Sequence, residues 1–235
     1  MSEQSNRLRI FAAVFVVCVA LLCAGLLPAP LINQPIAAAN LVKPSLPATA
    51  PSSEGRYKIN AGQSHFSVRA LVGGLLSAVA GHDHTIAIRD FSGTAAFTYG
   101  TVTPAALQFT VKADSLAVTD KVSDSDRNKI QTTMRDEVLE VNNYPEITFR
   151  STAITATRVE EGKYRTKITG DLTLHGTTRA ITMTAMVTFY EASLQAEGQF
   201  ALRQSDYGIK PVSVAGGTIK VKDELKFAFN IVANR

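Results

Sequence analysis

The most informative absence in this sequence is that of cysteine. The chain has 235 residues and two cysteines, Cys18 and Cys23, and both lie inside one apolar run near the N-terminus. The rest of the chain therefore offers no residue for a disulfide bond, a thiolate metal ligand or a cysteine nucleophile. A domain formed by that part must be stabilised by its hydrophobic core alone.

A clustered excess of one charge is absent as well. The 24 lysines and arginines are scattered among 20 acidic residues, for a net charge of +4. This distribution does not favour a nucleic-acid partner, and none is expected. The sequence also has no Gly-x-Ser-x-Gly motif and no phosphate-binding glycine loop. We therefore expect a protein that is not an enzyme and that needs no cofactor.

The sequence contains only one long apolar run, and it lies near the N-terminus. Arg7 and Arg9 precede an uncharged stretch of 18 residues, Ile10–Leu27. Residues 1–27 are predicted to form an apolar helix that is either a cleaved signal peptide or a membrane anchor through residues 10–27. The basic flank stays in the cytoplasm, so the following chain is expected to be periplasmic or otherwise extracytoplasmic, with any anchor in the inner membrane. Residues 28–55 hold six of the nine prolines and are predicted to form a linker.

Residues 56–235 show the alternation of half-buried β-strands. In AGHDHTIAIRDFSG, for example, Ile86 and Ile88 alternate with Ala87 and Arg89. Short turn signals separate about eight such strands, which is typical of an antiparallel sheet. Closing an eight-stranded sheet into a barrel removes its exposed edges, so the barrel is preferred and a two-sheet sandwich is the alternative.

One segment follows a helical period instead. Ser123–Asp126 supplies N-cap residues, and the apolar side chains recur at Ile130, Met134, Val138 and Val141. Tyr144-Pro145 is predicted to end the helix, because the residue before a proline avoids the helical region. The sequence thus predicts one amphipathic helix inserted between strands 4 and 5 of the barrel.

Six short motifs in residues 57–209 resemble the YceI-like, polyisoprenoid-binding proteins of bacteria. They are Tyr57–Asn60 followed by Ser64-x-Phe66-x-Val68, then Phe91–Gly93, Ala113–Leu116, Asn143–Thr152, Gly170–Thr178 and Arg203–Ile209. The resemblance implies a lipocalin-like barrel whose long interior cavity holds an isoprenoid chain, such as a quinone tail or a polyprenyl lipid. It implies binding rather than catalysis, in the periplasm or at the cell surface.

The apolar faces of the strands supply the candidate ligand contacts. These are predicted to be Phe66, Ile86, Ile88, Phe97, Phe109, Phe149, Leu172, Phe189, Phe227 and Phe229. The same side chains could instead fill the barrel, since an eight-stranded barrel can be packed solid or can hold one ligand. A solidly packed interaction or stress-response protein is therefore an alternative, and a homodimer also stays open.

The histidine pair is the one polar feature on these faces. His82 and His84 are one residue apart, in phase with Ile86 and Ile88, and are predicted to recognise the polar head of the ligand at the mouth of the barrel. Two imidazoles at this spacing also suit zinc, but a third ligand is missing, because Asp83 points to the opposite face. Two alternatives remain: a metal-dependent enzyme that uses His82 and His84, or a pair that is only a partly solvated strand end.

Overall fold

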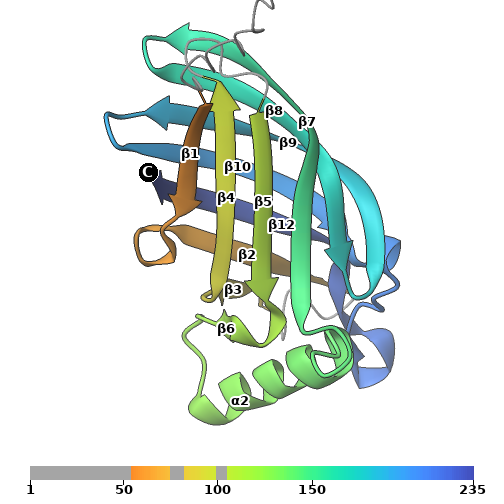
Figure 1. The fold of residues 1–235 in the computed structure, drawn as a ribbon. Coiled ribbons are helices and arrows are strands. Elements are labelled where there is room, and N and C mark those ends of the chain that lie inside the picture. Colours follow the sequence, from red (N-terminus) through yellow and green to blue (C-terminus); the bar gives the residue numbers. More distant parts are fainter. Residues whose placement is uncertain (1–53, 75–81, 99–104) are drawn as a thin grey trace, which may run out of the picture. The chain divides into compact units, whose positions relative to one another are not determined.

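A computed structural model describes residues 54–74, 82–98 and 105–235, which form an antiparallel β-sheet and one helix (Figure 1). The helix α2 (Asp124–Thr133) continues into a π-helical turn at Met134–Val138. The strands are β1 (Glu54–Ile59), β2 (His65–Gly73), β3 (His84–Ile88), β4 (Phe91–Thr98), β5 (Ala105–Lys112), β6 (Leu116–Val118), β7 (Glu146–Glu160), β8 (Lys163–Leu174), β9 (Thr177–Phe189), β10 (Ser193–Arg203), β11 (Ser213–Val214) and β12 (Ile219–Asn234).

The predicted N-terminal helix and most of the predicted linker lie outside the described residues. Among the residues that are described, no helix has the length and apolar character needed to cross a membrane. The signal or anchor at residues 1–27 therefore stays a prediction.

Eight of the strands form a closed barrel, as predicted, and not a sandwich. Their order is β1-β4-β5-β7-β8-β9-β10-β12, and each strand is antiparallel to its neighbours. The barrel closes where Lys58 and Ile59 of β1 pair with Asn234 and Ala233 of β12. Closure satisfies backbone groups that an open sheet would expose at its two edges.

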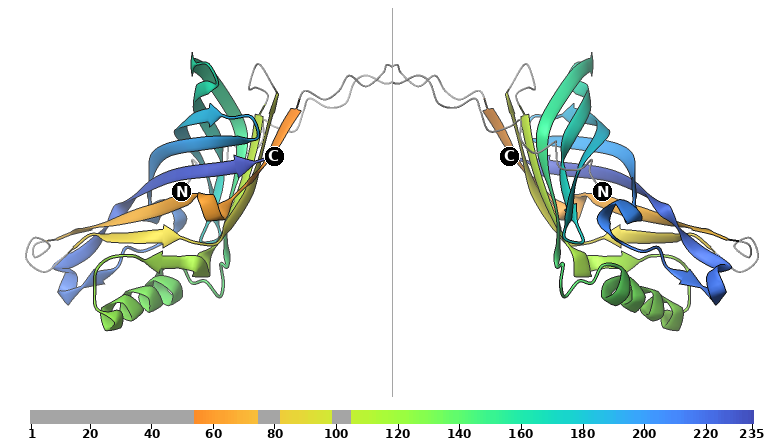
Figure 2. Two further views of the ribbon diagram at one scale, coloured as in Figure 1. Left: turned by 90° about the vertical axis from the view of Figure 1, so that its left-hand side faces the viewer. Right: turned by 90° about the vertical axis from the view of Figure 1, so that its right-hand side faces the viewer.

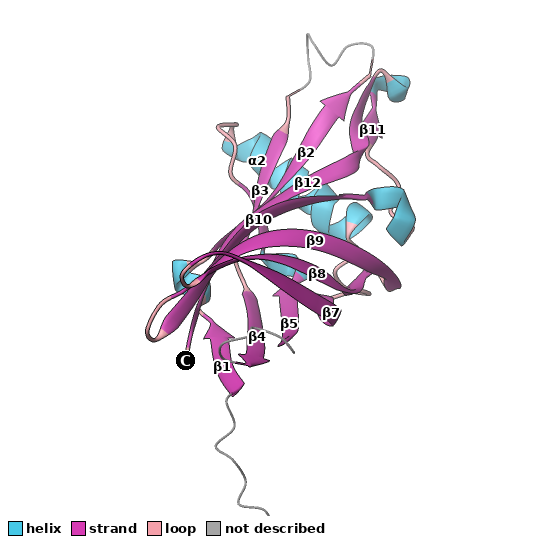
Figure 3. Ribbon diagram, turned by 90° about the horizontal axis from the view of Figure 1, so that it is seen from above, coloured by secondary structure: helices cyan, strands magenta, loops and turns pink. Residues whose placement is uncertain are grey.

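The remaining strands extend the sheet from β12. β1 and β2 run one after the other along the same edge of β12, separated by a 3₁₀ turn at Ala61–Gln63. Ser64 stabilises this break, because its hydroxyl donates to the Asn60 carbonyl and accepts a hydrogen bond from the Val232 N–H. Beyond it, β2 pairs with β3 and β3 with β6, and these strands project from the barrel beside α2 (Figures 2 and 3).

The helix was predicted to lie between strands 4 and 5, and this position was wrong. Six strands precede α2 rather than four, because the first strand is broken at the 3₁₀ turn and the short β6 follows β5. Side chains of α2 also form hydrogen bonds with backbone groups on the free edge of β6. Arg127 Nη1 donates to the Val118 carbonyl (2.8 Å), and the Val118 N–H donates to Gln131 Oε1 (3.2 Å).

The start of the helix was predicted correctly, but its end was not. The Ser123 hydroxyl accepts a hydrogen bond from the Asp126 N–H (3.1 Å), which is the arrangement of an N-cap. The helical segment ends at Val138 with Leu139 as its C-cap, and Glu140 then adopts a left-handed backbone conformation with φ of 46°. Val141 therefore lies outside the helix, and Tyr144-Pro145 follows its end by several residues.

Tyr207 is the most deeply buried large side chain of the described residues. It is 1% exposed, and its hydroxyl has no hydrogen-bond partner within the described part of the chain. Burial, with a smaller contribution from the nearby Asp206 carboxylate, raises the pKa of this phenol. An unpaired buried hydroxyl costs about 1–3 kcal/mol of stability.

Tyr207→Phe is therefore expected to raise the free energy of unfolding by about 1 kcal/mol at neutral pH. The folded protein keeps the phenolic proton after the unfolded chain begins to lose it, near the ordinary value of 10.0. Wild-type stability should thus fall as the pH rises above that value, and the variant should lose less. Urea denaturation measures both effects, with the exposed Tyr190 (55%) changed to Phe as the control. A destabilised Tyr207→Phe variant would contradict the expectation.

Candidate functional site

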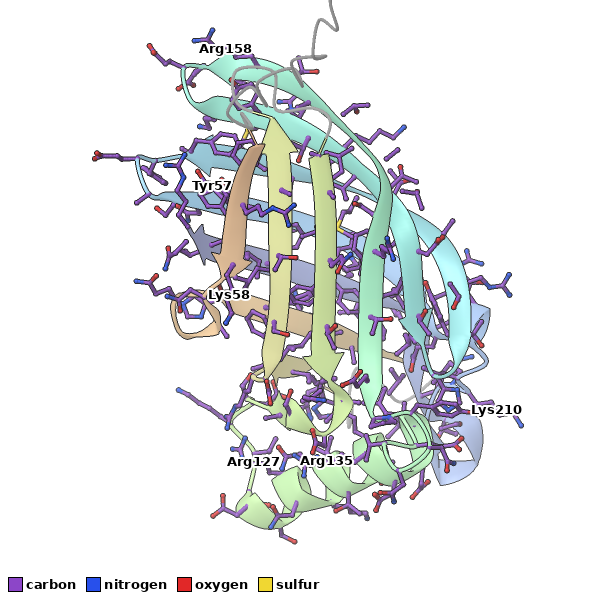
Figure 4. All side chains as sticks on the ribbon, viewed as in Figure 1. Tyr57, Lys58, Arg127, Arg135, Arg158 and Lys210 are labelled. Carbon is purple, nitrogen blue, oxygen red and sulfur yellow. The ribbon has the colours of Figure 1, made fainter. Side chains whose placement is uncertain are left out.

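The barrel encloses an elongated cavity of about 630 Å³. Its two ends are distinguished by α2, where Figure 4 labels Arg127, and by the β7–β8 hairpin, where it labels Arg158. We call these the helix end and the hairpin end. The walls come from the inward faces of the barrel strands, from β2 and β3, and from one face of the helix, and most lining side chains are aliphatic or aromatic. A cavity of this size is within the range of small-molecule binding sites.

Eleven of the twelve residues predicted as ligand contacts line this cavity. They are Phe66, His84, Ile86, Ile88, Phe97, Phe109, Phe149, Leu172, Phe189, Phe227 and Phe229. The twelfth, His82, is exposed and does not line it. Their role in binding a ligand stays a prediction, since the position of a side chain does not identify what it binds.

Several lining residues were not predicted as contacts. Ile168 and Met183 alternate with polar neighbours in the same way as the residues that were chosen, so that signal was present. Ile130, Met134 and Val138 were recognised only as the apolar face of a helix. No pattern in the sequence shows that this face lines the cavity at the helix end.

The aromatic side chains contact one another along the walls and, where Phe97 of β4 meets Phe189 of β9, across the barrel. Phe66 is surrounded by other rings, with centroids 5.6 Å from Phe109 and 6.2 Å from Phe229. Phe200 stacks on Phe227 at 4.6 Å, and Phe97 contacts Phe189 at 4.6 Å. These contacts restrict the rings, so the apolar surface is formed before any ligand enters.

Alanines explain why the interior is hollow. A methyl group at an inward position fills much less space than the leucine or phenylalanine that a solid core would need. Six alanines on inward faces line the cavity: Ala70, Ala95, Ala105, Ala185, Ala196 and Ala233.

The helix end of the cavity carries polar side chains. Lys129, Thr133 and Glu137 from the helix segment line it there, together with Ser213 of β11 and Lys220 of β12. Lys129, Glu137, Ser213 and Lys220 are exposed although they line the cavity, so this end opens to solvent. Within the described residues, the site is thus amphipathic, with an apolar interior and a polar opening at the helix end.

The polar groups deeper in the wall already have partners. The buried Thr166 hydroxyl donates to the Ala185 carbonyl (3.0 Å), and Gln204 Nε2 donates to the Lys222 carbonyl (3.0 Å). Beside Gln204, the Asp223 carboxylate accepts hydrogen bonds from the hydroxyl and the N–H of Ser205, which lower the pKa of Asp223. These bonds fix the 3₁₀ turn at Gln204–Tyr207 against β12.

His84 and His82 have different environments. His84 begins β3 and lines the cavity, and its Nδ1 is 2.9 Å from Asp120 Oδ2. His82 precedes the strand, and its ring contacts that of His84 at a centroid distance of 4.7 Å. Within the described residues, no three His, Cys, Asp or Glu side chains are grouped so that they could hold a metal ion. Asp120 is the partner that sequence reasoning missed, because 36 residues separate it from His84 and no motif links them.

Comparison with known proteins matches the part of the chain that forms the barrel. Residues 57–233 match the model of the YceI-like domain. A UPF0312 protein of Pseudomonas putida strain W619 is 27% identical over 144 residues, which cover 56% of this chain and 66% of that protein. The matched part is thus slightly under two thirds of that relative's length.

Two solved structures share the fold. Burkholderia cenocepacia BcnA superimposes with a TM-score of 0.55 at 19% identity, over 75% of this chain and 99% of BcnA. A polyisoprenoid binding domain from Saccharophagus degradans, implicated in plant cell wall breakdown, gives a TM-score of 0.53 at 13% identity, over 76% and 97% of the two chains. At these identities the similarity shows the barrel fold alone.

Proposed function

The chain belongs to the YceI-like domain family, and we propose that it binds a long apolar lipid, of the quinone or polyprenyl type, inside its barrel. The observation that carries this proposal is the preformed apolar cavity of about 630 Å³. An engineered apolar cavity of about 150 Å³ is enough to bind benzene, so this one has room for a chain several times larger. Each methylene that leaves water for such a site contributes about 0.8 kcal/mol.

The isoprenoid class is supported by similarity. The domain from Saccharophagus degradans, which shares the fold, is described as polyisoprenoid binding. An isoprenoid tail is long, narrow and fully apolar, which suits a cavity whose walls are aliphatic and aromatic over most of their length. The polar opening at the helix end suits the head of such a lipid. Binding, rather than catalysis, is the function that this arrangement supports.

We further propose that the barrel works outside the cytoplasm, exported by residues 1–27 or anchored through residues 10–27. The apolar run of 18 residues behind Arg7 and Arg9 supports this. A lipid-binding barrel near a membrane would have access to isoprenoid lipids. Dimerisation stays a prediction.

Organic extraction of the purified protein, followed by mass spectrometry, tests the binding function. Expression in bacteria should yield a co-purifying apolar lipid in close to stoichiometric amount. Delipidated protein should take up an added polyprenyl lipid and become more stable to heat, because a ligand that binds only the folded state stabilises it. If no lipid co-purifies and added lipids leave the melting temperature unchanged, the proposal is wrong.

A further inference from the structure

The bond between His84 and Asp120 determines which hydrogen-bonding group the neutral imidazole offers to a ligand. An ionised carboxylate can only accept hydrogen bonds, so the 2.9 Å contact requires the hydrogen to be on Nδ1. In a neutral ring the other nitrogen, Nε2, is then a bare acceptor. None of the described residues forms a hydrogen bond with Nε2.

The protein holds the carboxylate in place. Asp120 Oδ1 accepts the Thr85 N–H (2.9 Å), while Asp120 Oδ2 faces His84. The carbonyl oxygen of Asp120 accepts a hydrogen bond from Arg127 Nη2 (2.9 Å), which ties the residue to α2. The side chains of His84 and Asp120 are only 18% and 14% exposed. The position of the ring proton is therefore determined before a ligand arrives.

His84 also stands where the head of a bound lipid would lie. It pairs with Ala70 of β2, which pairs with Leu225 of β12, and all three line the cavity. Two residues further along β3, Ile86 continues the lining. A lipid whose tail occupies the apolar interior would thus bring its polar head to His84 and the polar opening at the helix end.

We propose that His84, positioned by Asp120, accepts a hydrogen bond from the head of the lipid, and that the site therefore selects heads that carry a hydroxyl group. This inference rests on the proposed lipid-binding function and narrows its ligand to long-chain alcohols and phenols, such as polyprenols and quinols. The carbonyl oxygen of a quinone or the oxygen of an ether offers only lone pairs, so it would leave Nε2 unpaired. An unpaired buried acceptor costs about 1–3 kcal/mol, or roughly tenfold in affinity.

Asp120→Asn is the sharpest variant because it should reverse the selection. The Thr85 N–H still needs an acceptor, so it orients the new amide with its oxygen toward Thr85 and its NH₂ toward His84. The NH₂ group donates to Nδ1, which moves the ring proton to Nε2 and makes Nε2 a donor. The variant should then prefer a head that only accepts hydrogen bonds.

The test compares two probes that share one tail, geranylgeraniol and its methyl ether, at about pH 8. Wild-type protein should bind the alcohol about tenfold more tightly than the ether. Asp120→Asn should prefer the ether, and ¹⁵N NMR of the imidazole should show the proton on Nε2. His84→Phe should bind both probes equally, and His82→Phe should retain the wild-type preference.

The outcomes separate this inference from the function on which it rests. Failure of wild-type protein to bind either probe would overturn both. Equal binding of the two probes by wild-type protein would overturn the role of His84 and leave lipid binding intact. The same conclusion would follow if Asp120→Asn moved the ring proton without changing the preference.

Discussion

Replacing Ala196 with phenylalanine is expected to abolish lipid binding while the barrel stays folded. Ala196 lies on β10 between Val187 of β9 and Ile231 of β12, and it lines the cavity. A phenyl ring at this position would occupy space that a lipid tail needs. Exclusion of about five methylenes removes on the order of 4 kcal/mol of binding free energy, or roughly a thousandfold in affinity.

Lipid titration and extraction measure the effect of Ala196→Phe, and urea denaturation reports its stability. The ring enters an existing void, so the free energy of unfolding should change by less than about 1.5 kcal/mol. Ala201→Phe is the matched control, since Ala201 is on the same strand but is exposed, and it should bind lipid normally. Ala196→Leu should give an intermediate affinity. A folded Ala196→Phe variant with wild-type affinity would show that lipid does not occupy the cavity.

The walls of this cavity could be predicted from the sequence, but the cavity itself could not. Period-two alternation assigned Phe109, Phe149 and Phe227 to inward faces, because successive side chains of a strand point to opposite sides. Alternation says nothing of how much space remains between opposite walls. That space depends on which small residues face one another across the barrel, and residues such as Ala95 and Ala185 are distant in the sequence.

The polar end of the cavity shows a second limit of prediction from the sequence. Alternation correctly assigned His84 to the same face as Ile86, and it extended this face to His82. The strand starts only at His84, because the Asp83 carboxylate accepts hydrogen bonds from the Val72 N–H (3.0 Å) and from Arg69 (3.1 Å). A local bond of this kind ends the regular pattern. The partner of His84, Asp120, comes from the loop before α2 and has no recognisable spacing.

Gly170 belongs to the motif Gly170–Thr178, which was recognised in the sequence. The structure shows the physical reason why this position is a glycine. A Cβ atom at this position would lie 2.4 Å from the Arg150 carbonyl oxygen, 2.5 Å from Phe149 Cζ and 2.7 Å from Ser151 Cα. Two of these neighbours are backbone atoms of β7, beside the irregularity in pairing between Ser151 and Ala153. Gly170 thus allows the two strands and the Phe149 ring to approach closely.

Gly170→Ala is therefore expected to lower the free energy of unfolding by about 3 kcal/mol, at the upper end of the range for overpacked sites. Urea denaturation measures the loss. Gly62→Ala is the control, because its nearest neighbour would be Asn60 Oδ1 at an ordinary 3.5 Å, and its stability should change by less than about 1 kcal/mol. Equal stability of the two variants would show that β7 can move away from β8 at little cost.

The same substitution should also weaken lipid binding, because the crowded ring belongs to the cavity. Phe149 lines the lumen, and relief of a 2.5 Å contact requires either the ring or the strand to shift. Gly93 and Gly198 have equivalent positions, where a Cβ would lie 3.2 Å from Phe109 and 2.6 Å from Phe229. Three glycines thus each accommodate a phenylalanine that lines the cavity. If Gly170→Ala loses stability but binds lipid with unchanged affinity, the Phe149 ring does not contribute to the binding surface.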